Sequence, residues 1–260
     1  MPPATTRSDP RHGGRRSRPQ QVAEAIKDWV MERGLQPGDR LPSETELIAR
    51  FAMAKGTIRE AVRILEAQGL VKSRTGPGGG VFVHQVSEDR AAALLGNYFY
   101  FRHLSIDDIY IVREALEPEL AAGLAGRLDA AQLAALEAVI ASYAAPARNA
   151  EEERAQHIES LRFHALLAEM SGNPLLRFLI RFTANMLSEV TVTRQLYAPP
   201  NPELWASGME YQSRLLAALR SGDSDSAHAI MTAHMRNAHR LMRAQEMAVT
   251  RRFLPEDGMI

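Results

Sequence analysis

Five polar side chains fall on the expected inward faces of amphipathic helices in the C-terminal part of the chain. At about 100° per residue, His234 lies opposite the arginines that mark the wet face of the last long helix, so we expect it to be buried. The same geometry turns inward four residues from three other helices: Arg113, Ser160, His164 and Gln212. A polar cavity in a helical bundle would satisfy all five. There Arg113 would supply the charge for a carboxylate or phosphate, and the histidines and Gln212 would orient the ligand by hydrogen bonds.

A second set of polar residues lies on the exposed side of a short helix predicted over residues 55–68. Lys55, Thr57 and Arg59 face away from the apolar positions of this helix. Lysine, threonine and arginine side chains can hydrogen-bond base edges in the major groove of DNA and the phosphates beside it. For Arg59 the alternative is an ordinary solvated partner of neighbouring charged residues. The helix is therefore a candidate for contact with nucleic acid.

The elements around that helix follow a recognisable order. Amphipathic spacing predicts a helix from about Gln20 to Gly34, and Ser43 with Glu46 three positions later has the form of a capping box that opens a second helix. After the third helix, two short β-type segments flank a glycine-rich turn and predict a hairpin over residues 70–83. Three short helices followed by a hairpin is the plan of a winged helix-turn-helix, whose third helix lies in the major groove.

The remainder of the chain has no alternating strand pattern, and its Gly, Pro and Asn breakers fall between amphipathic segments. Seven helices are predicted, at residues 88–101, 106–126, 130–144, 151–171, 174–196, 203–221 and 224–247. A bundle is the economical arrangement. The predicted fold class is mainly α, with a winged helix-turn-helix of three helices and a β-hairpin wing joined to an all-α bundle. The expected domains are a disordered basic arm at 1–18, the winged helix at 19–84, the bundle at 85–250 and a tail at 251–260.

Two further features of the helical part carry expectations. Residues 98–101 are four consecutive aromatics, which point all around a helix, so we expect burial between the domains or at a dimer contact rather than stacking on bases. His228 and His239 fall toward the polar side of the last helix, and we expect them at the surface.

The composition narrows the class of protein. The 260 residues contain 31 Lys+Arg, 31 Asp+Glu and no cysteine, which excludes a disulfide framework, a thiolate zinc site and a cysteine nucleophile. The charge is segregated, because residues 1–84 hold 14 basic and 9 acidic side chains while residues 85–260 hold 17 and 22. A basic N-terminal third suggests a polyanion as the partner of that part alone. No apolar run is long enough to span a bilayer, so we expect no membrane partner and a cytoplasmic location.

The N-terminal third resembles the DNA-binding domain of the GntR family of bacterial transcription regulators. The runs PGDRLPSETELIARF, IREAVRILEAQGLV and GPGGGVFV carry this resemblance. It implies that Lys55, Thr57 and Arg59 contact DNA from the third helix and that Thr75 and Gly76 form the wing tip in the minor groove. The expected surface also includes Arg74 and Thr45. Thr45 stands where many members carry arginine, and Lys55 also replaces a common arginine, so base selectivity is expected to differ there.

The second part resembles the all-helical effector domain called FCD, which defines the FadR subfamily of GntR regulators. The stretches VREALEPELAAGLA, LRFHALLAEMSGNP and LLAALRSGDSDSAHAIMTAHM carry the match. Many FCD domains hold a divalent metal with an aspartate and three further ligands, but here Ser160 replaces that aspartate and Gln212 replaces a histidine. Only His164 and His234 remain as metal ligands, which makes a poor site, so no cofactor is expected to be required. Hydrogen-bonded core histidines are the other alternative to an effector pocket.

The features together predict a ligand-responsive, DNA-binding transcription regulator rather than an enzyme. It is expected to be a homodimer on a palindromic operator, and a repressor released by a small carboxylate effector. One alternative is a metal-dependent helical-bundle enzyme. Against it, the sequence places no carboxylate beside His164 and His234 and shows no nucleophile–base spacing. The other is an architectural DNA binder without an effector, which ligand-induced thermal stabilisation would distinguish from a regulator.

Overall fold

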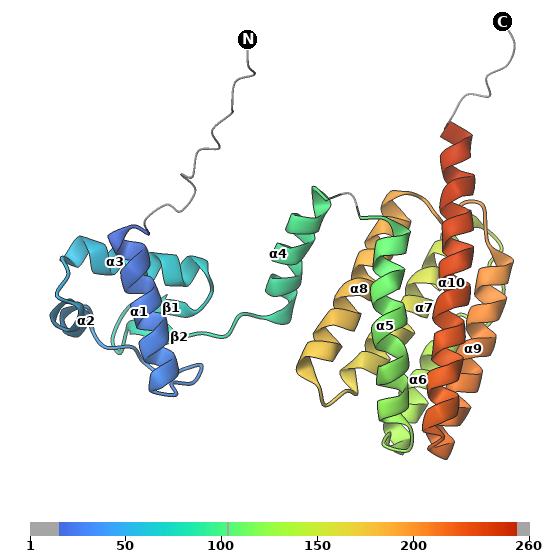
Figure 1. The fold of residues 1–260 in the computed structure, drawn as a ribbon, viewed down its shortest axis with the longest axis horizontal. Helices are drawn as coiled ribbons and strands as arrows, with labels where there is room; N and C mark the ends of the chain where they lie inside the picture. Colours follow the sequence, from blue (N-terminus) through green and yellow to red (C-terminus); the bar gives the residue numbers. More distant parts are fainter. Residues whose placement is uncertain (1–15, 103, 254–260) are drawn as a thin grey trace, which may run out of the picture. The chain divides into compact units, whose positions relative to one another are not determined.

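Three short helices and a two-stranded hairpin make up the first unit of the computed structural model, which describes residues 16–102 and 104–253 (Figure 1). They are α1 (Arg18–Glu32), α2 (Glu44–Phe51), α3 (Lys55–Ala67), β1 (Val71–Arg74) and β2 (Gly80–Val83). The winged helix-turn-helix expected from the sequence is confirmed. Residues 1–15 of the predicted basic arm lie outside the described residues. Arg18, the last residue expected in that arm, is instead the first residue of α1.

Local sequence signals explain where these helices begin. Ser17 and Ser43 each accept a hydrogen bond from the backbone N–H three residues later, and the side chains of Gln20 and Glu46 return a bond to the backbone of the cap. The capping box predicted at Ser43 is confirmed. Between α2 and α3 the chain turns through Ala52, whose φ of 51° lies in the left-handed region. This turn brings the beginning of α3 close to the beginning of α2.

The hairpin is held from both sides of β2. On one side β2 pairs with β1 as an antiparallel ladder, and on the other the N–H of Leu41 donates to the carbonyl of Val81 at 2.8 Å. The Arg40 side chain then reaches the tip of the hairpin, where Nη2 donates to the carbonyl of Gly79 at 2.6 Å. A Cβ on Gly80 would lie 2.6 Å from Nε of Arg40, so glycine is needed there for the arginine to pass.

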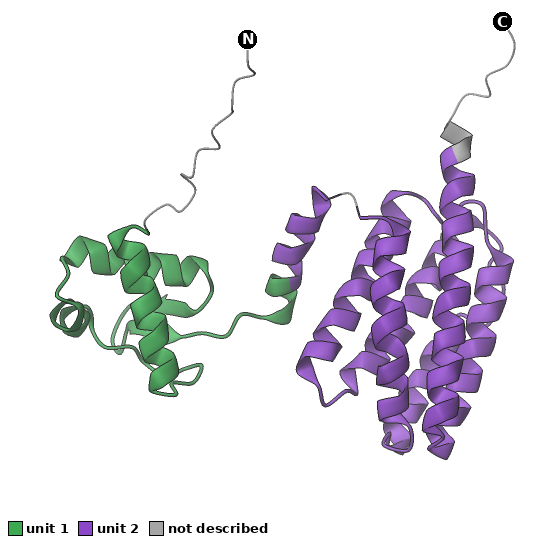
Figure 2. Cartoon of the chain, in the orientation of Figure 1, with its two compact units in different colours: residues 1–91 green, residues 92–260 purple. Residues whose placement is uncertain are grey.

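Seven helices were expected in the second part, and the described residues contain them. They are α4 (Glu88–Tyr100), α5 (Ile106–Leu124), α6 (Ala130–Ser142), α7 (Ala150–Glu169), α8 (Pro174–Thr193), α9 (Pro202–Ser221) and α10 (Ser224–Phe253). The chain divides into two units, residues 1–91 and 92–260, so the division falls inside α4 rather than at the boundary expected after residue 84 (Figure 2). The last helix continues to Phe253, three residues into the expected tail. No described helix is both long and apolar enough to span a bilayer.

The bundle contains two apolar clusters, and the buried polar residues lie between them along the helices. One cluster includes Leu120 of α5 and Met231 of α10, and the other includes Tyr110 of α5 and Met242 of α10. These two helices lie side by side in Figure 1. Between those apolar positions the two helices carry buried polar residues, namely Arg113, Glu117 and His234. The bundle therefore has a polar layer inside it.

The aromatic run on α4 is open to solvent within one chain. Tyr98, Tyr100 and Phe101 are 55%, 76% and 78% exposed, and α4 has no fully buried residue. The ring of Phe99 packs 6.0 Å from that of Phe182 on α8. Large exposed apolar side chains of this kind often mark a protein–protein contact.

The expectation that His239 lies at the surface is wrong. Its side chain is only 20% exposed, and its two ring nitrogens lie 2.7 Å from a carboxylate oxygen of Glu114 and 2.8 Å from one of Asp107. The ring also stacks on Tyr110, with centroids 5.0 Å apart. Helical spacing placed His239 beside the polar stripe, but the two acidic side chains of α5 draw it against that helix. His228, with a side chain 46% exposed, lies at the surface as expected.

Candidate functional site

The first turn of α3 presents Lys55, Thr57 and Arg59 on the side opposite the core of the first unit. Ile58 and Leu65 bury the other side of the helix, each 1% exposed. The side chains of Lys55 and Arg59 are 61% and 58% exposed, and Thr57 is half-buried. The free N–H groups at the start of a helix add partial positive charge to this turn. The three predicted contact residues thus share one accessible, positive end of a helix.

Glu44, the first residue of α2, joins the two basic side chains of that turn. Its Oε2 accepts from Nε of Arg59 at 2.7 Å, and its Oε1 lies 3.3 Å from Nζ of Lys55. The hydrogen bond from Arg59 lowers the pKa of Glu44 below its ordinary value. The bond uses Nε and leaves the terminal guanidinium nitrogens for an incoming acceptor. Sequence reasoning missed Glu44, because the contact depends on the turn that brings α2 against α3.

The other predicted DNA-binding residues lie on exposed parts of the same unit. Thr45 is on the first turn of α2, and Arg74, Thr75 and Gly76 form the end of β1 and the tip of the hairpin. Gly76 has a φ of 91°, a conformation that favours glycine. The guanidinium of Arg74 lies 4.5 Å over the ring of Phe82, which holds it against the wing. A hollow of about 450 Å³ lies among α2, α3 and the hairpin.

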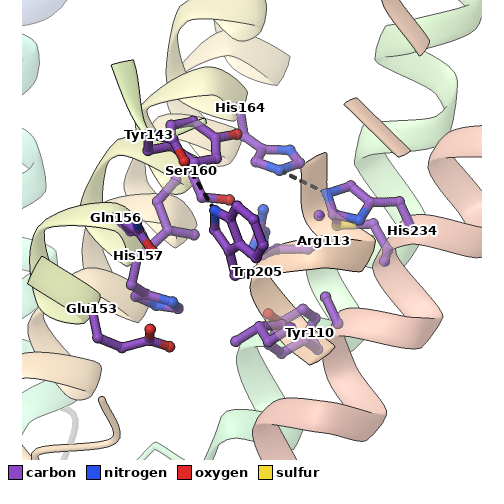
Figure 3. Close-up of a pocket in the computed structure, with 15 residues that line it drawn as sticks. Tyr110, Arg113, Tyr143, Glu153, Gln156, His157, Ser160, His164, Trp205 and His234 are labelled. Atoms are coloured by element: carbon purple, nitrogen blue, oxygen red, sulfur yellow. Dashed lines mark hydrogen bonds between the residues drawn. The ribbon is translucent and has the colours of Figure 1, made fainter. Parts of the chain in front are cut away.

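In the second unit, four buried side chains form a continuous hydrogen-bonded chain. Arg113 and Glu117 come from α5, His164 from α7 and His234 from α10. Nε of Arg113 donates to Oε1 of Glu117 at 2.5 Å, and Oε2 of Glu117 lies 2.5 Å from Nδ1 of His164. Nε2 of His164 then lies 3.2 Å from Nε2 of His234, the contact drawn between the two rings in Figure 3. None of the four is more than 5% exposed.

Glu117 overturns the expectation that no carboxylate lies beside the two histidines. Four residues after Arg113, it lies on the same face of α5 and is fully buried with it. Helical spacing contained this signal, because an i,i+4 arginine–glutamate pair stays together wherever its face points. A glutamate on an amphipathic helix is normally expected on the solvent-exposed face. Here the paired charge allows it to face inward.

The charges of this group follow from its contacts. Burial alone would raise the pKa of Glu117, but the charge of Arg113 and the contact with His164 bring it to about 2, so it is ionised at neutral pH. Burial lowers the pKa of His164 and that of His234, so both rings are neutral. A carboxylate only accepts, so Nδ1 of His164 donates to Glu117. Nε2 of His164 is then left to accept the N–H of His234.

Ser160 and Gln212 lie close together but are engaged with each other and with Tyr143. The Tyr143 hydroxyl donates to Oε1 of Gln212, and Nε2 of Gln212 donates to Oγ of Ser160 at 3.3 Å. Gln212 is fully buried and does not line the cavity, whereas Ser160 and Tyr143 do. The structure therefore brings together four of the five predicted pocket residues at the cavity wall and places Gln212 behind it.

The cavity has a volume of about 40 Å³, roughly three times the ~10–15 Å³ that one water needs on the same measure. Its wall includes Arg113, His164, His234, Trp205 and His157 (Figure 3). Burial, helped by the charge of Arg113, lowers the pKa of His157 to about 4, so this ring is neutral too. Nη2 of Arg113 is buried and has no hydrogen-bond partner. A buried guanidinium nitrogen without a partner is a candidate donor to an anionic ligand.

Comparison with protein families agrees with the two units. Residues 19–83 match the model described as bacterial regulatory proteins, gntR family, and residues 108–237 match the FCD domain. The chain belongs to the GntR family and carries an FCD domain. It is therefore a DNA-binding transcription regulator with a helical effector domain, as the resemblance predicted.

Known regulators are similar to this chain along most of its length. The HTH-type transcriptional regulator LutR of Bacillus subtilis is 28% identical over 78% of the chain and 91% of its own length. The putative L-lactate dehydrogenase operon regulatory protein of Escherichia coli is 27% identical over 86% of the chain and 85% of its own. A solved structure of Streptococcus agalactiae GntR covers 85% of the chain and 99% of its own at 25% identity, with a TM-score of 0.58. The relatives are regulators of transcription, and none of these names describes an enzyme.

The FCD metal implied by the resemblance does not fit the residues of this regulator. The facing nitrogens of His164 and His234 share a hydrogen bond, and the two replaced ligands, Ser160 and Gln212, bond to each other. Glu117 is held by Arg113 and His164. Within the part of the chain that the structure describes, no three His, Asp or Glu side chains form a group that could hold a metal ion.

Proposed function

We propose that this regulator is a dimeric repressor that leaves a palindromic operator when a small carboxylate binds in the cavity of its FCD domain. The observation that carries the proposal is the buried, unpartnered Nη2 of Arg113 in the cavity wall. A carboxylate is the natural partner of a guanidinium, because it accepts charge-assisted hydrogen bonds in the plane of the fork.

The surroundings of Arg113 support a small anion over a large one. Glu117 accepts a hydrogen bond from Nε of Arg113 and neutralises much of its charge, while Nη2 of Arg113 has no partner among the described residues. The cavity of about 40 Å³ admits a ligand of few heavy atoms. The Escherichia coli relative is named for an L-lactate dehydrogenase operon, and lactate is a carboxylate of this size.

A dimer is supported by the apolar residues left uncovered in one chain. They lie on α4, directly after it and on α5, namely Leu94, Tyr98, Tyr100, Phe101 and Ile111. One winged helix contacts little DNA, whereas two heads joined in a dimer bind two half-sites with a much higher combined affinity. The protein would act in the cytoplasm, where its operator is.

The proposed response follows from linkage. A ligand moves an equilibrium only by its different affinity for the two states, so the carboxylate must bind the free regulator more tightly than the operator-bound one. Ordering of Arg113 and its neighbours around the ligand would favour one arrangement of the bundle. In the dimer with that arrangement, the spacing of the two winged helix-turn-helix units would not match the spacing of the two half-sites. An architectural DNA binder would have no such ligand.

Thermal unfolding of the full-length regulator with small carboxylates tests this proposal. A carboxylate at about 100 times its Kd stabilises the folded state by ~2.7 kcal/mol, which raises Tm by several degrees. The matched control is the uncharged amide of each acid, which can accept a hydrogen bond from Arg113 but forms no ion pair with it, so it is expected to raise Tm much less. If no carboxylate raises Tm beyond its amide, the architectural alternative is favoured.

A further inference from the structure

A second residue that lines the cavity, Gln156, has a buried atom without a partner among the described residues, and this atom is an acceptor. Oε1 of Gln156 on α7 has no hydrogen-bond partner, while Nε2 of the same amide donates to the backbone carbonyl of Ala145. Because that carbonyl can only accept, the amide nitrogen must face it, and the oxygen is the atom left over. Gln156 lines the same cavity as Arg113.

The two unpartnered atoms give the cavity a polarity. Figure 3 shows Glu153, Gln156 and His157 on one side of the cavity and Arg113 and His234 on the other. The Glu153 carboxylate, 8% exposed, adds a second acceptor to the Gln156 side, where its Oε1 already accepts from the backbone N–H of Asn201 at 2.9 Å. One side of the cavity therefore offers a cationic donor and the other offers acceptors.

A simple alkanoate satisfies only one of these sides. Its carboxylate would pair with Arg113, but its hydrocarbon chain would leave the Gln156 oxygen buried and unpaired, which is unfavourable. A hydroxyl or an ammonium group on the ligand would donate to that oxygen. Sites built to hydrogen-bond a substituent reject analogues that lack it more strongly than apolar pockets reject a missing methylene.

We propose that the effector is a small carboxylate that also carries a hydrogen-bond donor, and that Gln156 is the residue that selects for the donor. This inference rests on the proposed function, because it assumes that Arg113 binds the carboxylate. It assigns to Gln156 a specificity that neither the helical pattern nor the FCD resemblance predicted. Either a hydroxyl or an ammonium group could donate this hydrogen bond, and matched acids that carry one or the other distinguish them.

Calorimetric titration of the full-length regulator with matched acids tests the inference. The probes are straight-chain carboxylates of three to six carbons with hydrogen, hydroxyl or ammonium at C2, beginning with propionate, lactate and alanine. For the chain length that binds best, a donor-bearing acid is expected to bind at least about tenfold more tightly than its parent. The stronger of the hydroxyl and ammonium series identifies the donor.

The variant Gln156→Met removes the acceptor at similar side-chain length. It is expected to lose the tenfold advantage of the donor-bearing acid, because the parent acid no longer leaves a buried oxygen unpaired and the donor no longer has an acceptor. The control is Gln68→Met, an exposed glutamine of the first unit, which is expected to change neither affinity. Equal binding of parent and donor-bearing acids by the unaltered regulator overturns the inference but leaves the proposed function standing. If no acid of the series binds, both are overturned.

Discussion

Replacing Arg59 with alanine is expected to weaken operator binding at least about 100-fold while the protein stays folded and dimeric. Arg59 lies on the exposed first turn of α3, and Glu44 holds its Nε so that the terminal nitrogens can reach a base edge. One good bidentate contact between arginine and guanine is worth ~1–3 kcal/mol, and a dimer places two such arginines on the operator. Fluorescence anisotropy with labelled operator at constant salt measures the loss.

The comparison variant for this prediction is Arg63→Ala, one turn further along α3. The Arg63 side chain is 74% exposed and, among the described residues, pairs with Glu60 on its own helix, so its loss is expected to weaken binding less than about tenfold. Circular dichroism and sedimentation check that both variants are folded dimers. If a folded Arg59→Ala dimer binds the operator with unchanged affinity, then α3 is not the helix that reads DNA.

Removal of the Arg113 guanidinium is expected to weaken effector binding by about 100-fold or more and to leave operator affinity unchanged. Truncating one partner of a buried charge pair costs ~2–5 kcal/mol, because both the contact and the neutralisation are lost. Arg113 also holds Glu117, so a single substitution would leave that buried carboxylate without its main counter-charge. The double variant Arg113→Met with Glu117→Gln removes both charges and keeps an acceptor for Nδ1 of His164.

Calorimetry with the tightest-binding carboxylate and operator anisotropy are the two readouts for that variant. Arg127→Met is the control, since Arg127 is an exposed arginine of the second unit. An operator complex of the double variant that is still released by the carboxylate would show that the effector binds elsewhere.

Helical spacing predicted which parts of the site are buried better than it predicted their partners. His164, Gln212, His234 and Arg113 are buried, as their positions on amphipathic helices indicated. Periodicity gives the direction of a side chain from its own helix axis, and in a bundle that direction decides burial. It does not say which residue of another helix lies opposite.

The features that sequence reasoning missed all depend on contacts between helices. No carboxylate was expected beside the two histidines, yet Arg113 and His164 make the burial of Glu117 possible. His239 was expected in solvent, yet two carboxylates of α5 hold it. Gln212 faces inward as predicted, but its Oε1 accepts a hydrogen bond from the hydroxyl of Tyr143, a residue that the sequence did not single out. Each of these outcomes involves a contact between two helices; the spacing within one helix shows the pairing of Arg113 with Glu117 but not the partners on other helices.

In the proposed mechanism, a small molecule in the FCD cavity and the operator DNA each weaken the binding of the other through the dimer. The most direct test is to measure the affinity of the tightest-binding carboxylate for the free regulator and for the regulator saturated with operator DNA. The proposed mechanism predicts at least about tenfold weaker binding to the complex, with an equal loss of operator affinity when the carboxylate is saturating, because linkage is reciprocal. The same Kd for the free and the operator-bound regulator would contradict it.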